Sequence, residues 1–282
     1  MHRFVHNGRG VHAPAGRTPV ERITIDDMKR IELEIMDEID RICRAEGLSY
    51  VLGYGSCLGA MRHKGFIPWD DDMDLLMPRA DYERLIEGFD RFKAVDRYQL
   101  ATYRDRSGIY PFVKVVDSST KVFENFAAKQ YSTGVWVDIF PLDDVADPKD
   151  EAFARGTRLS LVRSLIVADP SVGSTPFVKF VKRVTHPVFS RMDPYEAARK
   201  IDENAHYAFE GETDRCCDIV GEETPGKLLP KAWFEPVEVD FEDRRYLAPK
   251  YFDEYLTTVY GDWRTPPAPD DRDVHVHEAY RL

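Results

Sequence analysis

The sequence feature that most constrains the fold of this chain is the stretch GFIPWDDDMDLLM, residues 65–77. Four acids fall within five positions, and an apolar run follows directly: Asp70, Asp71, Asp72, Asp74 and then Leu75–Met77. Burying unneutralised carboxylates costs far more free energy than an ordinary core returns. A chain that leads its densest negative charge into an apolar strand therefore needs positive charge at that point, and a bound cation supplies it.

The charge and hydropathy of the whole chain argue against several classes of protein. The 282 residues carry a formal net charge of −11, whereas nucleic-acid binders present surplus Lys and Arg to phosphates. No apolar stretch approaches the roughly 20 residues that span a bilayer. Residues 1–20 lack the continuous apolar segment of a signal peptide and indicate a flexible arm. We expect a soluble protein that contacts a membrane at most peripherally.

The cysteines form neither a disulfide framework nor a CxxC metal pair. Cys43 and Cys57 lie on expected apolar faces, where buried thiols are common, and the adjacent Cys216 and Cys217 are interpreted as structural. This usage fits a reducing cytoplasm.

Residues 21–145 alternate between helix and strand signals. TIDDMKRIELEIMDEIDRICRAEG predicts a helix with Thr24 as its N-cap, acids in its first turn and Gly47 at its end. Its apolar stripe is Met28, Ile31, Ile35, Ile39 and Ile42. Strands are expected in SYVLGYGS, MDLLM, YQLATY, PFVKVVD, TKVFENF and GVWVDIFPLDDV, and helices in CLGAMRH and RADYERLIEGFDRF. Strands interleaved with helices predict a mixed α/β or α+β sheet.

The chain changes character after residue 145. Residues 146–229 are mostly helical in pattern, and residues 151–192 interleave Lys and Arg with Leu, Val, Ile and Phe around a break at DPSVGSTP. Residues 230–282 form an aromatic-rich segment that we expect to pack back on residues 21–145.

Three separate pieces of the sequence point to one site. A strand runs into the turn Gly55-Ser56, an acid–apolar alternation carries Asp72 and Asp74, and Asp138 lies alone inside a later strand. Residues i and i+2 of a strand share a face, so Asp72 and Asp74 project together, and Mg²⁺ usually takes one or two carboxylates plus substrate phosphates. Gly55 lets a phosphate approach the backbone, and the Ser56 hydroxyl can hold it at a helix N-terminus. If the strand of Asp138 is a neighbour, this acid joins the cluster.

The stretch YGSCLGAMRHKGFIPWDDDMDLLMPRADYERL closely resembles the signature of the LicD family, which also includes the fukutin-type proteins. Further matches are PFVKVVDSSTKVFE, GVWVDIFPLDDV and YFDEYLTTVYGDWRTPP. The resemblance is strong over residues 24–145, moderate over 230–275 and loose over 146–229. It implies an α+β fold with a nucleotidyltransferase-like mixed sheet flanked by helices, a catalytic core at 21–145, a helical insertion and a C-terminal extension.

The activity that the resemblance implies is transfer of a phospho-alcohol from a CDP-alcohol to a glycan hydroxyl, with release of CMP. Phosphocholine from CDP-choline is the best-known donor group, and ribitol and glycerol phosphates are also represented. The metal-binding acids of the family map onto Asp72 and Asp74, its third acid onto Asp138, and its Gly-Ser turn onto Gly55-Ser56. Mg²⁺ or Mn²⁺ is then the expected cofactor, and Asp138 is either a general base or a further metal ligand.

Basic and aromatic residues near these motifs are candidates for binding the donor. Lys114 in PFVKVVD either binds a donor phosphate or is a snorkelling surface lysine. Arg62 and His63 could also neutralise phosphate, and Trp69 either stacks on the cytosine or seals the acidic loop. Two residues that alternate as on a strand stay unassigned: His275 and His277.

Residues 151–192 allow two interpretations. They form either surface helices with solvated charge, or a surface that docks on an anionic membrane carrying a lipid-linked glycan acceptor. In the second case each Lys or Arg contributes roughly 1 kcal/mol of attraction. The protein would then work at the inner face of the membrane.

Three other functions stay open. In a nucleotide-sugar glycosyltransferase an Asp-x-Asp pair also holds a metal on a diphosphate, but there the acids follow an apolar strand, and here they precede one. An NTP-dependent nucleotidyltransferase would release pyrophosphate. A glycan- or metal-binding module would need no catalysis at all.

Overall fold

The computed structural model describes residues 21–124, 127–145, 151–172, 175–208, 213–221, 228–268 and 278–282. The arm expected at residues 1–20 lies outside the described residues, as do His275 and His277.

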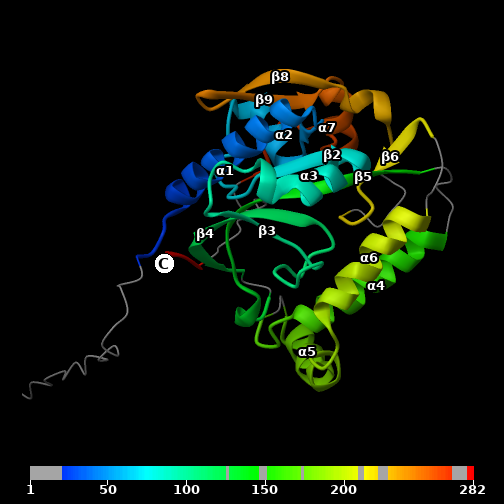
Figure 1. Ribbon diagram of the computed structural model, residues 1–282. Coiled ribbons are helices and arrows are strands. Elements are labelled where there is room, and N and C mark those ends of the chain that lie inside the picture. Colours follow the sequence, from blue (N-terminus) through cyan, green and yellow to red (C-terminus); the bar gives the residue numbers. More distant parts are fainter. Residues whose placement is uncertain are drawn as a thin grey trace, which may run out of the picture.

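A mixed β-sheet forms the centre of the molecule (Figure 1). Its main path runs β1 (Val51–Leu52), β2 (Asp74–Pro78), β5 (Thr133–Asp144), β4 (Val113–Phe123) and β10 (Glu278–Arg281). β3 (Tyr98–Ala101) pairs with β4, and β6 (Arg215–Cys217) joins β5 to β7 (Leu229–Pro230). β2 and β5 are parallel, and the other described pairs are antiparallel. The fold class is α+β, as the sequence predicts.

Helix α1 (Ile25–Glu46) has the boundaries that the sequence predicts. Thr24 and Asp27 form a capping box, and Gly47 ends the helix in the left-handed conformation at φ 61°. The whole apolar stripe of α1 is buried, and the helix packs against β4 and β5. Helix α3 (Arg79–Phe92) packs against β2 and β5 through a stripe that includes Tyr82, Leu85 and Phe89.

Helix α2 (Tyr54–His63) begins earlier than the sequence analysis predicts. Gly55 and Ser56 are not a turn before the helix but lie in its first turn, and Gly53 is the N-cap. The reason is that β1 is only Val51–Leu52, so the chain enters the helix three residues sooner. The two separate strands expected in PFVKVVD and TKVFENF are likewise one strand, β4, with an irregular register between Asp117 and Val122.

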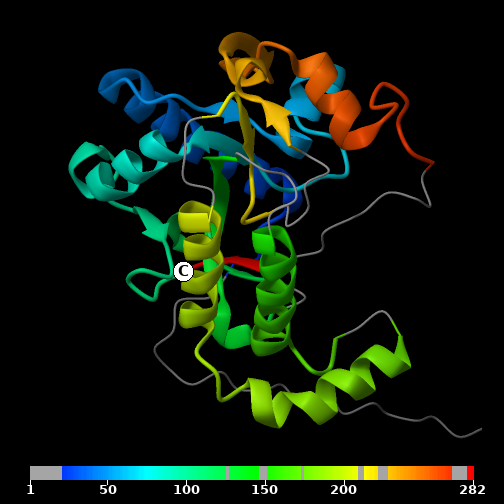
Figure 2. The same ribbon diagram turned by 90° about the vertical axis from the view of Figure 1, so that its right-hand side faces the viewer.

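Three helices form a layer beside the sheet, namely α4 (Glu151–Val167), α5 (Pro176–Phe189) and α6 (Pro194–Ala208). α4 and α6 lie side by side, and α5 extends away at the end remote from the core (Figure 2). The remaining elements are the short helices η1 (Lys129–Tyr131) and η3 (Lys231–Phe234), the hairpin β8 (Pro236–Phe241) with β9 (Arg244–Pro249), and α7 (Phe252–Tyr260). α7 packs against α2 and β9, so this part of the C-terminal segment contacts the core.

All four cysteines are buried and free, which fits their interpretation as structural residues. Among the described helices, none combines the length and the apolar composition that crossing a bilayer requires.

Candidate functional site

The centre of the candidate site is a row of charged residues across three neighbouring strands, which we call the acid row. Asp74, the first residue of β2, lies in register with Asp138 of β5, and Asp138 in turn lies in register with Lys114 of β4. Backbone hydrogen bonds fix this arrangement, because the N–H of Asp138 donates to the carbonyl of Met73 at 2.8 Å. Two of the acids that the sequence singles out are therefore direct neighbours in the sheet.

Lys114 is a buried residue, so it is not the snorkelling surface lysine that the sequence allowed. Its exposed fraction is 2%, and its Nζ lies 3.1 Å from Oδ1 of Asp138 and 3.9 Å from a carboxylate oxygen of Glu124. The Nζ also lies 3.9 Å from the ring centroid of Trp136, whose indole N–H donates to Asp138 at 3.1 Å. This lysine provides positive charge at the inner end of the acid cluster.

Burial and mutual repulsion raise the pKa values of the acids in this row. Desolvation raises the pKa of Asp74 well above its usual value, and the charges of Asp72, Asp138 and Asp70 raise it further. Burial raises the pKa of Asp138 to about 7, although Lys114 lowers it, and the charge of Asp72 raises it. Asp72 therefore lies within electrostatic reach of both strand acids. In the absence of additional positive charge these carboxylates are destabilised.

The first turn of α2 is held against the strand that carries Asp74. The Ser56 hydroxyl is buried and accepts the N–H of Asp74 at 2.8 Å. A Cβ atom on Gly55 would lie 2.7 Å from Oδ2 of Asp70, so a side chain at position 55 would push that carboxylate aside. The group next to Gly55 is thus the carboxylate of Asp70 and not a phosphate. It lies at the N-terminus of α2, where the helix dipole favours negative charge.

Arg62 and His63 lie in the last turn of α2, at the opposite end of the helix from Gly55 and Ser56. The Arg62 guanidinium donates to the carbonyl of Trp263 at 2.8 Å. The His63 ring lies edge-on to Trp69, with the ring centroids 6.0 Å apart. Burial and the neighbouring Arg62 lower the pKa of His63. Their assignment to a donor phosphate stays a prediction.

The donor chemistry of the cluster fits a hard divalent cation. All the candidate ligands are carboxylate oxygens, which Mg²⁺ and Mn²⁺ accept. Within the described part of the chain, however, no three His, Cys, Asp or Glu side chains converge closely enough to form a ready metal site. This pattern fits an ion held by one or two carboxylates together with substrate phosphates rather than by an all-protein cage. Binding of magnesium by these residues stays a prediction.

The sequence analysis missed one acid that faces this cluster, Glu32 of α1. Its exposed fraction is 2%, and its Oε2 is buried without a hydrogen-bond partner. Desolvation raises the pKa of Glu32 well above its usual value, and the charges of Asp72 and Asp71 raise it further. The signal was present, because Glu32 lies four residues after Met28 and three before Ile35, on the apolar stripe of the helix.

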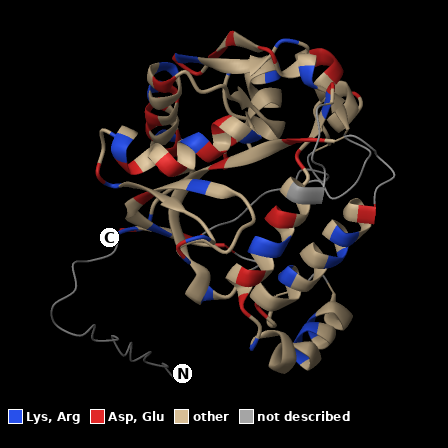
Figure 3. Cartoon of the chain, turned by 45° about the vertical axis from the view of Figure 1, so that its right-hand side comes forward, with Lys and Arg blue, Asp and Glu red and all other residues tan. Residues whose placement is uncertain are grey.

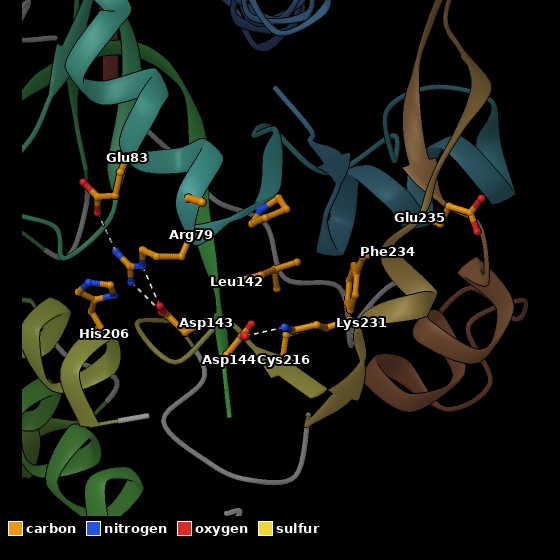
Figure 4. A pocket seen from close by; sticks show the side chains of 12 residues that line it. Arg79, Glu83, Leu142, Asp143, Asp144, His206, Cys216, Lys231, Phe234 and Glu235 are labelled. Carbon is orange, nitrogen blue, oxygen red and sulfur yellow. Dashed lines mark hydrogen bonds and ion pairs between the residues drawn. The ribbon is translucent and has the colours of Figure 1, made fainter. Parts of the chain in front are cut away.

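A cavity of about 730 Å³ lies away from the acid row, at the other end of β2 and β5 (Figure 4). Arg79, which lines it, lies 2.6 Å from a carboxylate oxygen of Asp143 and 2.8 Å from one of Asp202. Lys231 is similarly paired with Asp144. Because these charged groups neutralise one another, they indicate a structural ion-pair network rather than a binding site for a charged donor.

The chain is similar in sequence to known proteins. Residues 47–161 match the family described as LicD/FKTN/FKRP, nucleotidyltransferase domain. The lipopolysaccharide cholinephosphotransferase LicD of Haemophilus influenzae is 29% identical over 282 residues, which are 93% of this chain and 100% of that protein. An uncharacterized protein of Rickettsia typhi is 33% identical over 63 residues, 22% of this chain and 20% of its own length.

The family match includes the whole acid row, namely Asp74, Asp138 and Lys114, and it also includes Asp72. The similarity to the Haemophilus protein extends over nearly all of both chains. Residues 47–161 are therefore identified as a LicD-type domain, and the similarity to the Haemophilus protein over nearly the whole chain indicates a phosphotransferase of the LicD type.

Proposed function

We propose that this protein transfers a phospho-alcohol from a CDP-alcohol to a hydroxyl of a cell-surface glycan or its lipid-linked precursor, and releases CMP. The observation that carries the proposal is the register of Asp74, Asp138 and Lys114 beneath the first turn of α2. The name of the Haemophilus relative supports phosphocholine as the transferred group and lipopolysaccharide as the acceptor.

The residues of the site divide the work of phosphoryl transfer, which needs positioning and charge neutralisation above all. Asp72 and Asp74 would hold Mg²⁺ or Mn²⁺, which neutralises negative charge on the diphosphate and the leaving CMP. Lys114 adds positive charge from inside the sheet and favours the ionised form of Asp138. Asp138 is the candidate to accept the proton of the attacking hydroxyl, and its pKa of about 7 suits a general base near neutral pH.

A panel of nucleotide donors tests this proposal. With Mg²⁺ and a lipopolysaccharide acceptor, we expect CMP release from at least one of CDP-choline, CDP-glycerol and CDP-ribitol. We expect no UDP release from UDP-sugars and no pyrophosphate release from CTP or ATP. An excess of EDTA should abolish CMP release, and added Mg²⁺ should restore it. Release of UDP would favour the glycosyltransferase alternative, and release of pyrophosphate would favour the nucleotidyltransferase.

We also propose that α5 docks the enzyme on the anionic inner face of a membrane. None of the side chains of α5 is buried, and four apolar ones are spaced along one side of the helix, namely Phe177, Phe180, Val184 and Val188. Their exposed fractions run from 59% to 73%. Lys179, Lys182 and Arg183 alternate with them, and Figure 3 shows basic residues gathered on this outlying helix. An amphipathic helix with a basic polar face is typical of interfacial binding.

Vesicle co-sedimentation tests the membrane proposal. The protein should pellet with vesicles that contain phosphatidylglycerol and not with pure phosphatidylcholine vesicles. The double variant Phe177→Ser/Phe180→Ser should weaken binding at least about tenfold, because burial of each Phe contributes about 1.5–3 kcal/mol. A matched control is Tyr251→Ser, which alters an exposed aromatic residue at the start of α7. Pelleting that survives the double variant, or that ignores lipid charge, would contradict docking through α5.

A further inference from the structure

A second cavity, of about 490 Å³, lies between the sheet and α4. One wall of it is aromatic and consists of Tyr54, Tyr110, Phe112 and Phe140. The rings contact one another in series, because the centroids of Tyr110 and Phe112 are 5.1 Å apart, those of Phe112 and Phe140 4.2 Å, and those of Phe140 and Tyr54 5.8 Å. The opposite wall includes Ser160, Arg163 and Ser164 of α4 and the segment around Asp218–Gly221. No step of the proposed transfer uses this cavity.

The aromatic wall continues the acid row along the same face of the sheet. Phe140 follows Asp138 by two residues on β5, and Phe112 precedes Lys114 by two residues, directly before β4 begins at Val113. Side chains two residues apart share a face and are separated by about 6.6 Å along the strand. If a donor phosphate binds at the acid row, a short alcohol attached to its phosphorus atom would therefore lie over these rings.

Opposite charges lie at the two ends of the aromatic series. At the Tyr110 end, Nζ of Lys114 lies 4.3 Å from the ring centroid and the guanidinium carbon of Arg163 lies 4.7 Å from it. At the Tyr54 end, the buried carboxylate of Asp218 accepts the phenol hydroxyl of Tyr54 at 2.9 Å. The cavity thus presents positive charge where it adjoins the acid row and negative charge at its far end.

The Tyr54 ring is held firmly at that far end. Tyr54 is the first residue of α2 and has a positive φ of 38°. Its N–H donates to the hydroxyl of Tyr255 at 3.0 Å, and its own hydroxyl is bound to Asp218. A non-glycine residue in this region costs about 1–3 kcal/mol and persists where the surrounding structure over-determines it, often at a ligand site.

We propose that this cavity binds the trimethylammonium group of a phosphocholine donor, between the Phe112–Phe140 pair, Tyr54 and Asp218. The inference rests on the proposed transfer from a CDP-alcohol and narrows the alcohol to choline. Aromatic faces attract quaternary ammonium ions through cation–π interactions, and a nearby carboxylate adds Coulombic attraction. Phosphocholine carries a negative phosphate and a positive trimethylammonium group. Its charges match those of the cavity when the phosphate lies toward Lys114 and the trimethylammonium group toward Asp218. The two phenylalanine rings offer no hydrogen-bond partner for the hydroxyls of glycerol or ribitol.

The test compares donors in steady-state CMP release. We expect the wild-type protein to use CDP-choline with a lower KM than CDP-ethanolamine or CDP-glycerol. Phe140→Leu and Asp218→Asn should each raise the KM for CDP-choline about tenfold. They should leave the KM for CDP-glycerol within about twofold, because glycerol carries no cation. Phe140→Tyr, which keeps an aromatic face, should retain the preference. The matched control is Phe92→Leu, a partly buried aromatic residue at the end of α3 that does not line this cavity.

Several outcomes separate this inference from the proposed function. Equal changes for CDP-choline and CDP-glycerol, or a wild-type preference for CDP-glycerol, would overturn the choline assignment while leaving CDP-alcohol transfer intact. Absence of CMP release from every CDP-alcohol would refute the proposed function itself. Calorimetry with phosphocholine would then test the cavity by itself. Weaker binding of phosphocholine to Phe140→Leu than to the wild type would support the site, and equal binding to the two proteins would exclude it. Thermal melting of each variant identifies any that fails to fold.

Discussion

Replacement of Asp74 by asparagine is expected to lower CMP release from the preferred CDP-alcohol by at least about a thousandfold, which corresponds to about 4 kcal/mol of transition-state stabilisation. Asparagine keeps the size of the side chain and the backbone N–H that donates to Ser56, but it removes a charge from the proposed cation site. Steady-state assays at saturating Mg²⁺ measure the loss. Asp72→Asn should behave in the same way.

The same substitution should not destabilise the fold. Burial and the charges of Asp72 and Asp138 raise the pKa of Asp74 well above its usual value, so the ionised carboxylate opposes folding in the absence of metal. In EDTA at pH 8 we expect the melting temperature of Asp74→Asn to equal or exceed that of the wild type. Asp240→Asn is the matched control, because its side chain is 71% exposed on the outer hairpin. An active Asp74→Asn, or an inactive Asp240→Asn, would contradict the assignment.

Lys114→Met is expected to lower the free energy of unfolding at pH 8 by about 3–5 kcal/mol, because it leaves the buried Asp138 carboxylate without its partner. Methionine preserves most of the volume of the lysine, so the loss is electrostatic rather than a cavity effect. Urea denaturation in EDTA measures it. The double variant Lys114→Met/Asp138→Asn should recover most of the stability, since neither residue is then charged. Equal instability of the single and double variants would show that the ion pair is not the cause.

The loss in Lys114→Met should also depend on pH. The pKa of Asp138 is raised by burial to about 7 in the folded protein, above its usual value in the unfolded chain. The folded state therefore retains a proton that the unfolded state releases, and stability falls as pH rises from about 4 toward 7. Without Lys114 the pKa of Asp138 rises further, so this fall continues to higher pH. At pH 5 we expect the variant to approach the wild type.

The sequence predicted those parts of the fold that local patterning determines. The capping box of Thr24 and the apolar stripe of α1 are local signals, and both were correct. The start of α2 was placed too late, because the length of β1 depends on its pairing with β2 rather than on propensity. The same reason explains why two short strands were expected where β4 is continuous across an irregularity.

In the candidate site, too, the local sequence indicated single residues, whereas their contacts depend on the tertiary structure. A lone acid in an apolar strand suggested Asp138, but only the sheet order places it in register with both Asp74 and Lys114. The sequence left open whether Lys114 is buried, since that depends on Trp136 and Tyr110, which cover it from different parts of the chain. Asp218 could not have been connected with Tyr54, because the two are 164 residues apart.

Manganese binding tests most directly the central claim that Asp72 and Asp74 hold one divalent cation together with the phosphates of the donor. Electron paramagnetic resonance titration of Mn²⁺ should show one ion bound per chain, at least about tenfold more tightly with CDP-choline present, because substrate phosphates complete the ligand set. Asp72→Asn and Asp74→Asn should each abolish the donor-dependent binding, and Asp240→Asn should not. Unchanged Mn²⁺ binding in the Asp72→Asn and Asp74→Asn variants would contradict the account.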